Sequence, residues 1–243
     1  MFRNISKILI VSPHSDDELF ALPFISSLKQ NVDVLLLEND EQRYKESIMS
    51  SKINRFNLKI YRGEKVAKGN FFHKILKQLI FDFANLFDNY DLILSPIIEG
   101  GHQDHDTVCF ALLYCKKIKN GKAKLFFYST YRSVEKLPFI YTCGFSKNIP
   151  KDSIIKVSIP KDILLKIFYT VMIAYKSQYK TWLLLLPALV LTNFKGDFNK
   201  LCDADKLDFK RIKKFIPKIP LYQKYRNLKR DQWIKEIDVI YNN

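Results

Sequence analysis

The sequence is poor in glycine, cysteine and histidine. Its 243 residues include seven glycines, four cysteines and four histidines. No low-complexity block or internal repeat is present, which excludes fibrous and solenoid architectures. No two cysteines have the CxxC spacing of cysteine-rich zinc sites. We therefore expect four buried free thiols in a reducing compartment rather than disulfides or metal ligands. These are Cys109, Cys115, Cys143 and Cys202.

Long apolar runs are also missing. The N-terminal run, residues 8–11, is too short for the hydrophobic region of a signal peptide. The longest later run, residues 182–191, contains Pro187 and is about half of the roughly 20 residues that a membrane span needs. We therefore expect no transmembrane helix and a cytoplasmic protein.

Acidic residues are in deficit. The chain has 40 lysines and arginines against 25 aspartates and glutamates, a formal charge of +15. The basic residues are scattered and no nucleic-acid-binding motif organises them, so we expect no nucleic-acid partner. A solvated basic surface is one interpretation. The basic tail around Trp182, with its leucines and tyrosines, also leaves open a peripheral membrane contact, against the alternative that this cluster packs in the core. The sequence does not fix the oligomeric state.

Short β-branched runs alternate with helical periodicity along the chain, which has 47% hydrophobic and 27% charged residues. This alternation predicts βαβ units, and hence a Rossmann-like three-layer α/β fold with a mostly parallel sheet. We expect one domain, 1–243, with a core at 1–180 and a mainly helical C-terminal extension at 181–243. The expected strands are 7–12, 32–37, 59–61, 91–95, 124–128 and 154–159, and the expected helices are 17–29, 42–56, 70–87, 104–118 and 161–179.

Two polar clusters follow expected strands. The first is PHSDDE, residues 13–18, and the second is GGHQDHD, residues 100–106. Three of the four histidines lie in these clusters, a concentration that packing does not explain. Parallel sheets bind ligands beyond the carboxyl ends of their strands, so both clusters are candidate site residues.

These residue types suit metal-assisted hydrolysis. A catalytic zinc takes three histidine or carboxylate ligands and keeps one position open. His14, Asp17 and His105 provide such a set, which would also accept iron or cobalt. Asp16 is then left beside the metal as a general base. His102 can stabilise an oxyanion or protonate a leaving amine, and Asp104 can accept a histidine ring N–H. Taken singly, each cluster has a plainer interpretation, the first as a helix cap.

At these residues the chain resembles the PIG-L/LmbE-like family of zinc-dependent N-deacetylases, which carry a His-Pro-Asp-Asp-Glu type motif and a later His-x-Asp-His motif. The resemblance implies zinc on His14, Asp17 and His105, Asp16 as the base, and His102 at the tetrahedral intermediate. It extends from residue 7 to about 128, and more faintly to 178.

The resemblance also implies two substrate-binding residues. Arg43 begins an Arg-x-x-Glu pair, which is also an ordinary pattern on an exposed helix. Tyr175 stands where many members have histidine. Ser15 and Gln103 occupy positions that are often proline, so we expect altered loop stiffness at both.

The expected function is hydrolysis of the acetamide of an N-acetylated amino sugar, such as an N-acetylglucosamine-type conjugate or glycan intermediate, with release of acetate. The substrate class comes from the resemblance, because the motifs by themselves indicate only metal-assisted hydrolysis. The alternatives are hydrolysis of another acyl amide, such as a formamide, and a carbohydrate-binding protein with a vestigial metal site. The group to which the sugar is attached is not revealed.

Overall fold

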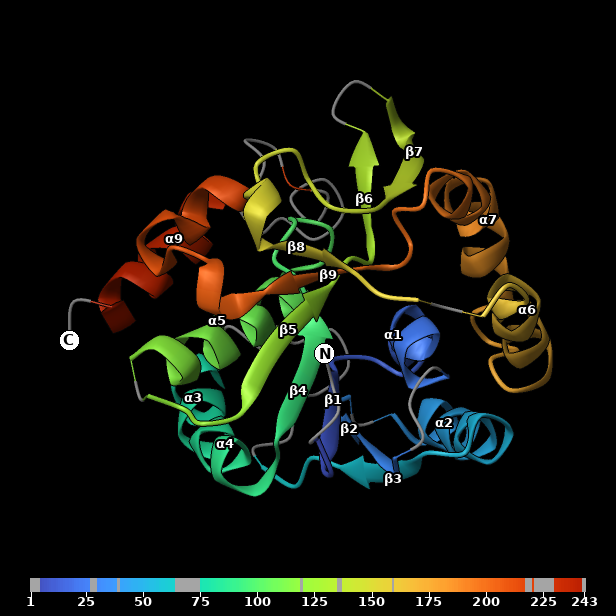
Figure 1. The fold of residues 1–243 in the computed structure, drawn as a ribbon, viewed down its shortest axis with the longest axis horizontal. Helices are drawn as coiled ribbons and strands as arrows, with labels where there is room; N and C mark the ends of the chain where they lie inside the picture. Colours follow the sequence, from blue (N-terminus) through green and yellow to red (C-terminus); the bar gives the residue numbers. More distant parts are fainter. Residues whose placement is uncertain are drawn as a thin grey trace.

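A seven-stranded sheet in the order β3-β2-β1-β4-β5-β9-β8 forms the centre of the protein (Figure 1). β1 to β5 run parallel, and β9 and β8 join antiparallel at one edge. The computed structural model describes residues 5–26, 30–38, 40–63, 75–118, 120–134, 137–158, 160–216, 220 and 230–241. The strands of the sheet are β1 (Ile8–Ser12), β2 (Val32–Leu36), β3 (Asn57–Ile60), β4 (Leu92–Pro96), β5 (Lys124–Tyr128), β8 (Ile154–Lys156) and β9 (Lys200–Asp203).

Apolar residues of the central strands serve two separate cores. In β1, Leu9 and Val11 join one buried cluster, and Ile8 and Ile10 join the other. Strand side chains alternate between the faces of a sheet, so a continuous apolar run marks a strand covered on both sides. This burial confirms the predicted three-layer α/β fold.

The helices form a layer on each face of the sheet. One layer, left of the sheet in Figure 1, contains α3 (Leu76–Ala84), α4 (Leu86–Asn89), α5 (Gln103–Lys117) and α9 (Arg230–Tyr241). The other, on the right, contains α1 (Glu18–Ile25), α2 (Glu41–Asn54), α6 (Ile163–Ile173) and α7 (Tyr179–Phe194).

The C-terminal part of the chain belongs to this architecture. It is mainly helical, as predicted, and includes the 3-10 helices η3 (Ala204–Lys206) and η4 (Phe209–Phe215). Its strand β9 lies between β5 and β8, and Trp233 of α9 is buried in the core beside α5. The sequence did not predict β9 or the separate hairpin of β6 (Tyr131–Val134) and β7 (Leu137–Cys143); the short 3-10 helix η2 (Lys151–Ser153) precedes β8.

The segment predicted as one helix, 161–179, is two helices. α6 ends at Ile173 and α7 begins at Tyr179. Between them the Glu46 carboxylate accepts hydrogen bonds from the Ser177 backbone N–H at 2.8 Å and from its hydroxyl at 2.7 Å. This contact takes the Ser177 amide away from helical hydrogen bonding. The helix predicted at 70–87 is described from Leu76 onward and is divided at Asn85; residues 70–74 lie outside the described part.

Two absences predicted from the sequence concern the described residues. All four cysteines are buried and carry free thiols, as expected. No helix in the described ranges is both long and apolar enough to cross a membrane.

Candidate functional site

The two motif loops meet at one edge of the sheet. Residues 13–18 follow β1, and residues 100–106 begin shortly after β4. β1 and β4 are hydrogen-bonded parallel neighbours, so their carboxyl ends lie side by side at the same edge of the sheet. The fourth histidine, His73, lies outside the described residues.

The first loop holds its shape through its own polar groups. The Ser12 hydroxyl donates to the His14 carbonyl oxygen at 2.8 Å, and the His14 backbone N–H donates to Asp17 Oδ2 at the same distance. Asp16 has a backbone φ of 90°, a conformation that few non-glycine residues adopt. Strained residues of this kind concentrate at functional sites.

The second loop needs its two glycines. Gly100 has a φ of 70°, which suits glycine. A Cβ on Gly101 would lie 2.1 Å from the Tyr131 carbonyl oxygen, so no side chain fits there. Asp106 Oδ1 accepts the Gly100 backbone N–H at 3.1 Å, and the His102 side chain caps α5 by accepting the Asp104 N–H at 3.2 Å. The loop is thereby fixed to the helix that carries Asp104 and His105.

His14, Asp17 and His105 converge, although they come from the two separate loops. Asp17 Oδ2 lies 3.2 Å from His14 Nδ1 and 3.0 Å from His105 Nε2. The possible ligand atoms of the three residues all lie within 4.8 Å of one another. The side chains of Asp17 and His105 are buried, whereas that of His14 is partly exposed. The group therefore has the donors and the partial access that a catalytic metal site requires.

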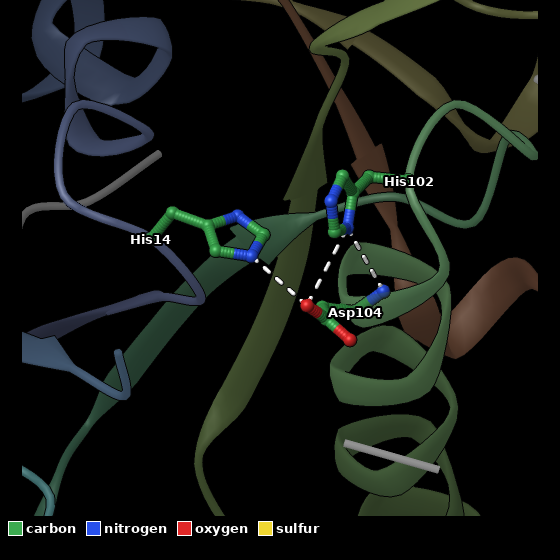
Figure 2. A group of neighbouring side chains, drawn as sticks. All are labelled: His14, His102 and Asp104. Carbon is green, nitrogen blue, oxygen red and sulfur yellow. Dashed lines mark hydrogen bonds and ion pairs between the residues drawn. The ribbon is translucent and has the colours of Figure 1, made fainter. Parts of the chain in front are cut away.

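A second group of possible metal ligands shares His14. It comprises His14, His102 and Asp104, drawn in Figure 2. Asp104 Oδ2 lies 3.0 Å from His14 Nε2 and 3.6 Å from His102 Nδ1. The rings of His14 and His102 meet edge to face, with their centroids 4.4 Å apart. His14 thus has one carboxylate at each ring nitrogen, Asp17 at Nδ1 and Asp104 at Nε2.

These contacts determine the charge of the site. Burial would lower the pKa of His14, but the hydrogen bonds and charges of Asp104 and Asp17 outweigh it and raise that pKa to about 10. Burial would raise the pKa of Asp17, but His105 and His14 hold it well below its ordinary value. Without a metal, His14 is therefore protonated beside an ionised Asp17. An arriving cation must displace the His14 proton.

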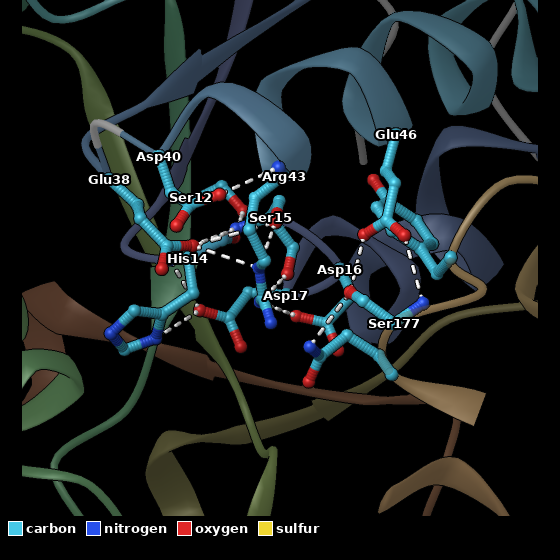
Figure 3. A network of polar contacts seen from close by, with 12 residues as sticks. Ser12, His14, Ser15, Asp16, Asp17, Glu38, Asp40, Arg43, Glu46 and Ser177 are labelled. Atoms are coloured by element: carbon cyan, nitrogen blue, oxygen red, sulfur yellow. Dashed lines mark hydrogen bonds and ion pairs between the residues drawn. The ribbon is translucent and has the colours of Figure 1, made fainter. Parts of the chain in front are cut away.

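Asp16 follows His14 in the same loop but has partners of its own, of which Figure 3 shows Arg43. Arg43 Nη2 donates to its Oδ1 at 2.9 Å, and Trp182 Nε1 donates to its Oδ2 at 2.8 Å. Burial raises the pKa of Asp16 to about 7, helped by the neighbouring charges of Asp17 and Glu18, while Arg43 and Trp182 act in the opposite direction. A carboxylate with this pKa can both take up and release a proton near neutral pH.

Arg43 lies on the first turn of α2 and reaches back to the first loop. Besides Asp16, its guanidinium contacts Ser15 and the Glu38 carboxylate, the latter at 3.1 Å. It therefore connects β2, α2 and the loop after β1. Its predicted contact with substrate stays a prediction.

Tyr175 is fully buried behind the first loop. Its hydroxyl donates to Glu18, whose carboxylate also accepts the Ser50 hydroxyl at 2.8 Å and the Asp16 backbone N–H at 3.1 Å. This links the segment between α6 and α7 to the start of α1 and to α2. The predicted role of Tyr175 in substrate binding stays a prediction; its observed contact is with Glu18.

Sequence reasoning missed three partners of the site residues. Trp182 lies far along the chain in a segment without a motif, and no sequence signal points to its contact with Asp16. Glu38 follows β2 as the motifs follow β1 and β4, so its position was a usable signal. Thr130 likewise follows β5, and its Oγ1 lies 3.3 Å from His105 Nδ1.

Several solved structures share this fold. The zinc-inhibited form of teicoplanin deacetylase Orf2 is 16% identical, with a TM-score of 0.51 over 71% of this chain and 85% of the other. A triple mutant of the teicoplanin-pathway deacetylase is 17% identical, with a TM-score of 0.51 over 86% and 90%. N,N'-diacetylchitobiose deacetylase from Pyrococcus horikoshii is 15% identical, with a TM-score of 0.50 over 84% and 86%. No protein-family model and no curated protein matches the chain. At these identities the similarity shows the fold.

Proposed function

We propose that this protein is a metal-dependent hydrolase that removes the N-acetyl group from an N-acetylated amino sugar and releases acetate. The convergence of His14, Asp17 and His105 beside a separately held Asp16 carries the proposal. The fold neighbours named as deacetylases of teicoplanin and of N,N'-diacetylchitobiose support the choice of an acetylated sugar.

His14, Asp17 and His105 would hold the metal. Two neutral imidazoles and one carboxylate are a donor set that zinc, iron and cobalt accept. Asp104 would then orient the His14 ring through Nε2, as carboxylates behind metal-binding histidines do. Bound there, the metal would lower the pKa of a water molecule and polarise the substrate carbonyl. One fold neighbour is described as a zinc-inhibited form, so the activating metal must be identified by experiment.

Asp16 would act as the general base. Its carboxylate takes a proton from the attacking water while the water oxygen bonds to the acetamide carbonyl carbon. Arg43 and Trp182 each occupy one Asp16 oxygen, so both position the group and restrict its rotation. When the carbon–nitrogen bond breaks, the protonated Asp16 can pass this proton to the departing amine.

His102 would act on the carbonyl oxygen of the acetamide. Its ring lies against that of His14 and is partly exposed, so it can reach a substrate bound in front of the loops. A donor at this position stabilises the negative charge that forms on the carbonyl oxygen. The products are acetate and an amino sugar that carries the transferred proton.

Acetate release tests this function. The purified protein is supplied with zinc, iron(II) or cobalt in turn and incubated with N,N'-diacetylchitobiose and other N-acetylglucosamine conjugates. We expect acetate and free amine in equal amounts with at least one metal. Formyl analogues of the same sugars, assayed for formate, distinguish deacetylation from hydrolysis of another acyl amide.

An Asp16→Asn variant provides the matched control. Loss of the base predicts a rate lower by about 10²–10⁴-fold with metal content unchanged. An Asp16→Asn variant as active as the wild type would remove Asp16 from the mechanism, and a metal-loaded wild type that releases no acyl group would reject the hydrolase.

A further inference from the structure

α6 and α7 expose an unusual number of large apolar side chains. Phe194 is 84% exposed and Leu165 is 74% exposed. Folded monomers rarely leave a contiguous apolar patch of this kind open to water unless it binds something. Eight of the nine exposed large apolar residues of these helices are here called the α6–α7 face, the ninth being Tyr179 at the start of α7. The eight are Leu165, Tyr169, Met172 and Ile173 of α6 and Leu183, Leu184, Leu191 and Phe194 of α7.

These side chains form one stripe on each helix. In α6 the exposed positions 165, 169, 172 and 173 recur at helical spacing, as do 183, 184, 191 and 194 in α7. The opposite sides of both helices, with Ile167 of α6 and Leu185 of α7, are buried in the same core cluster. α6 and α7 contact each other and share that core, and the two helices lie together at the right edge of Figure 1, each with its stripe away from the core.

Within the two helices the formal charge has one sign, although the exposed Asp162 lies directly before α6. From residue 163 to 196 the sequence contains no aspartate or glutamate. Lys176, Lys180 and Lys195 of this segment are exposed and form no ion pair within the described part of the chain. Of the acidic residues that flank the segment, Asp197 is paired with Lys200.

We propose that the α6–α7 face is a docking surface for an anionic lipid bilayer. The apolar stripes would enter the boundary between headgroups and acyl chains, and the lysines would contact lipid phosphates. No spanning segment is needed, because the helices would lie in the plane of the surface. A second copy of the chain is a poorer partner, because two such faces would bring lysines together with no acidic residue in the segment to pair them.

Docking would place the candidate site close to the bilayer. α7 carries the exposed Leu183 and Leu184 on one side and the buried Trp182 on the other, and Trp182 donates to Asp16. The segment before α7 is held to α2 by the contact between Ser177 and Glu46. The surface and the site therefore share one helix. The docking itself does not depend on the proposed reaction.

Vesicle sedimentation tests the docking. The full chain is mixed with vesicles of phosphatidylcholine alone, or with added phosphatidylglycerol, at low and high salt. We expect binding to the anionic vesicles that weakens with salt. Leu184→Ser/Phe194→Ser should reduce this binding by about tenfold or more, since both side chains would leave the lipid. Lys180→Glu/Lys195→Glu should remove the preference for anionic lipid.

Phe81→Ser/Val239→Ser is the matched control, because both residues are exposed on helices of the other layer. It should bind vesicles like the wild type. A wild type that does not sediment with anionic vesicles at low salt overturns the docking, as does an equal loss in the control. A dimer that Leu184→Ser/Phe194→Ser converts to monomer, without vesicle binding, assigns the face to self-association. Acetate release from a water-dissolved substrate, measured in parallel, reports on the hydrolase separately.

Discussion

At the scale of single residues, the site gives two adjacent carboxylates, Asp16 and Asp17, different pKa values. Asp17 is stabilised as an anion by two histidines, whereas the adjacent Asp16 is partly buried, contacts Arg43 and Trp182 and has a pKa of about 7. Such a division of roles between neighbouring carboxylates is typical of sites where one holds a cation and the other moves a proton.

Glu99 gives a prediction about pH and stability. It is buried, and burial raises its pKa from 4.5 to about 7, although Arg132 and hydrogen bonds from Ser129 and Ser146 act against this. The folded chain therefore holds this proton more tightly than the unfolded chain. Its contribution to the free energy of unfolding is complete below pH 4.5 and is lost as the pH rises through 7.

Urea unfolding at pH 5 and pH 8, with chelator present, measures this effect. Between the two pH values the free energy of unfolding of the wild type should fall by about 2.5 kcal/mol more than that of Glu99→Gln. Other groups that titrate in this range, Asp16 included, contribute to both proteins and cancel. Equal losses of unfolding free energy in the two proteins would show that folding does not raise the pKa of Glu99.

At the scale of elements, the loop before α5 depends on Gly101. An alanine there would place its Cβ against the backbone of Tyr131, so the loop must move and take His102 with it. We expect Gly101→Ala to lower acetate release by about tenfold or more, because small displacements of catalytic groups cost that much. Gly196→Ala is the control: its φ of 65° predicts a small loss of stability, but no atom lies within 4 Å of the new Cβ and activity should persist.

α7 provides a second prediction at this scale. Trp182→Phe removes the hydrogen bond that lowers the pKa of Asp16. The acid limb of the kcat/KM profile should then move to higher pH, by on the order of one pH unit, with activity recovering above it. Trp233→Phe loses a comparable bond, from Nε1 to the Thr107 hydroxyl at 3.1 Å, on the other side of the sheet. That variant should leave the profile in place, and a shift common to both would indicate a general loosening of the fold.

Elements with strong local signals could be predicted from the sequence. The strands β1, β4 and β5 are nearly continuous apolar runs buried on both faces, so a short window is enough to identify them. β9 and the β6–β7 hairpin escaped prediction because a strand such as Lys200–Asp203 has no clear period and exists through its partners in the sheet. The end of α6 was missed for a similar reason, since the Ser177 amide is bound by Glu46 from another helix.

In the candidate site, too, the local sequence motifs were predictable and the long-range contacts were not. The two motifs are contiguous in the sequence, and the rule for parallel sheets brings them together. The contact between Trp182 and Asp16 joins positions that are far apart in the chain, and it depends on how α7 packs on α1. A single sequence carries no local signal for such a contact.

At the scale of the whole molecule, the C-terminal part completes the structure around the site. β9 extends the sheet, α9 buries Trp233 against α5, and α7 supplies Trp182. The C-terminal part, which lacks motifs, therefore contributes helices to both layers, and its helix α7 carries half of the α6–α7 face.

Metal content measures the central claim most directly. The protein is purified without chelator, and the wild type is compared with His14→Ala/His105→Ala by elemental analysis. We predict about one divalent metal ion per wild-type chain, and little or none in the variant, since two of the three ligands are gone. A wild type that holds no metal, and takes up none when zinc, iron or cobalt is supplied, would contradict the account.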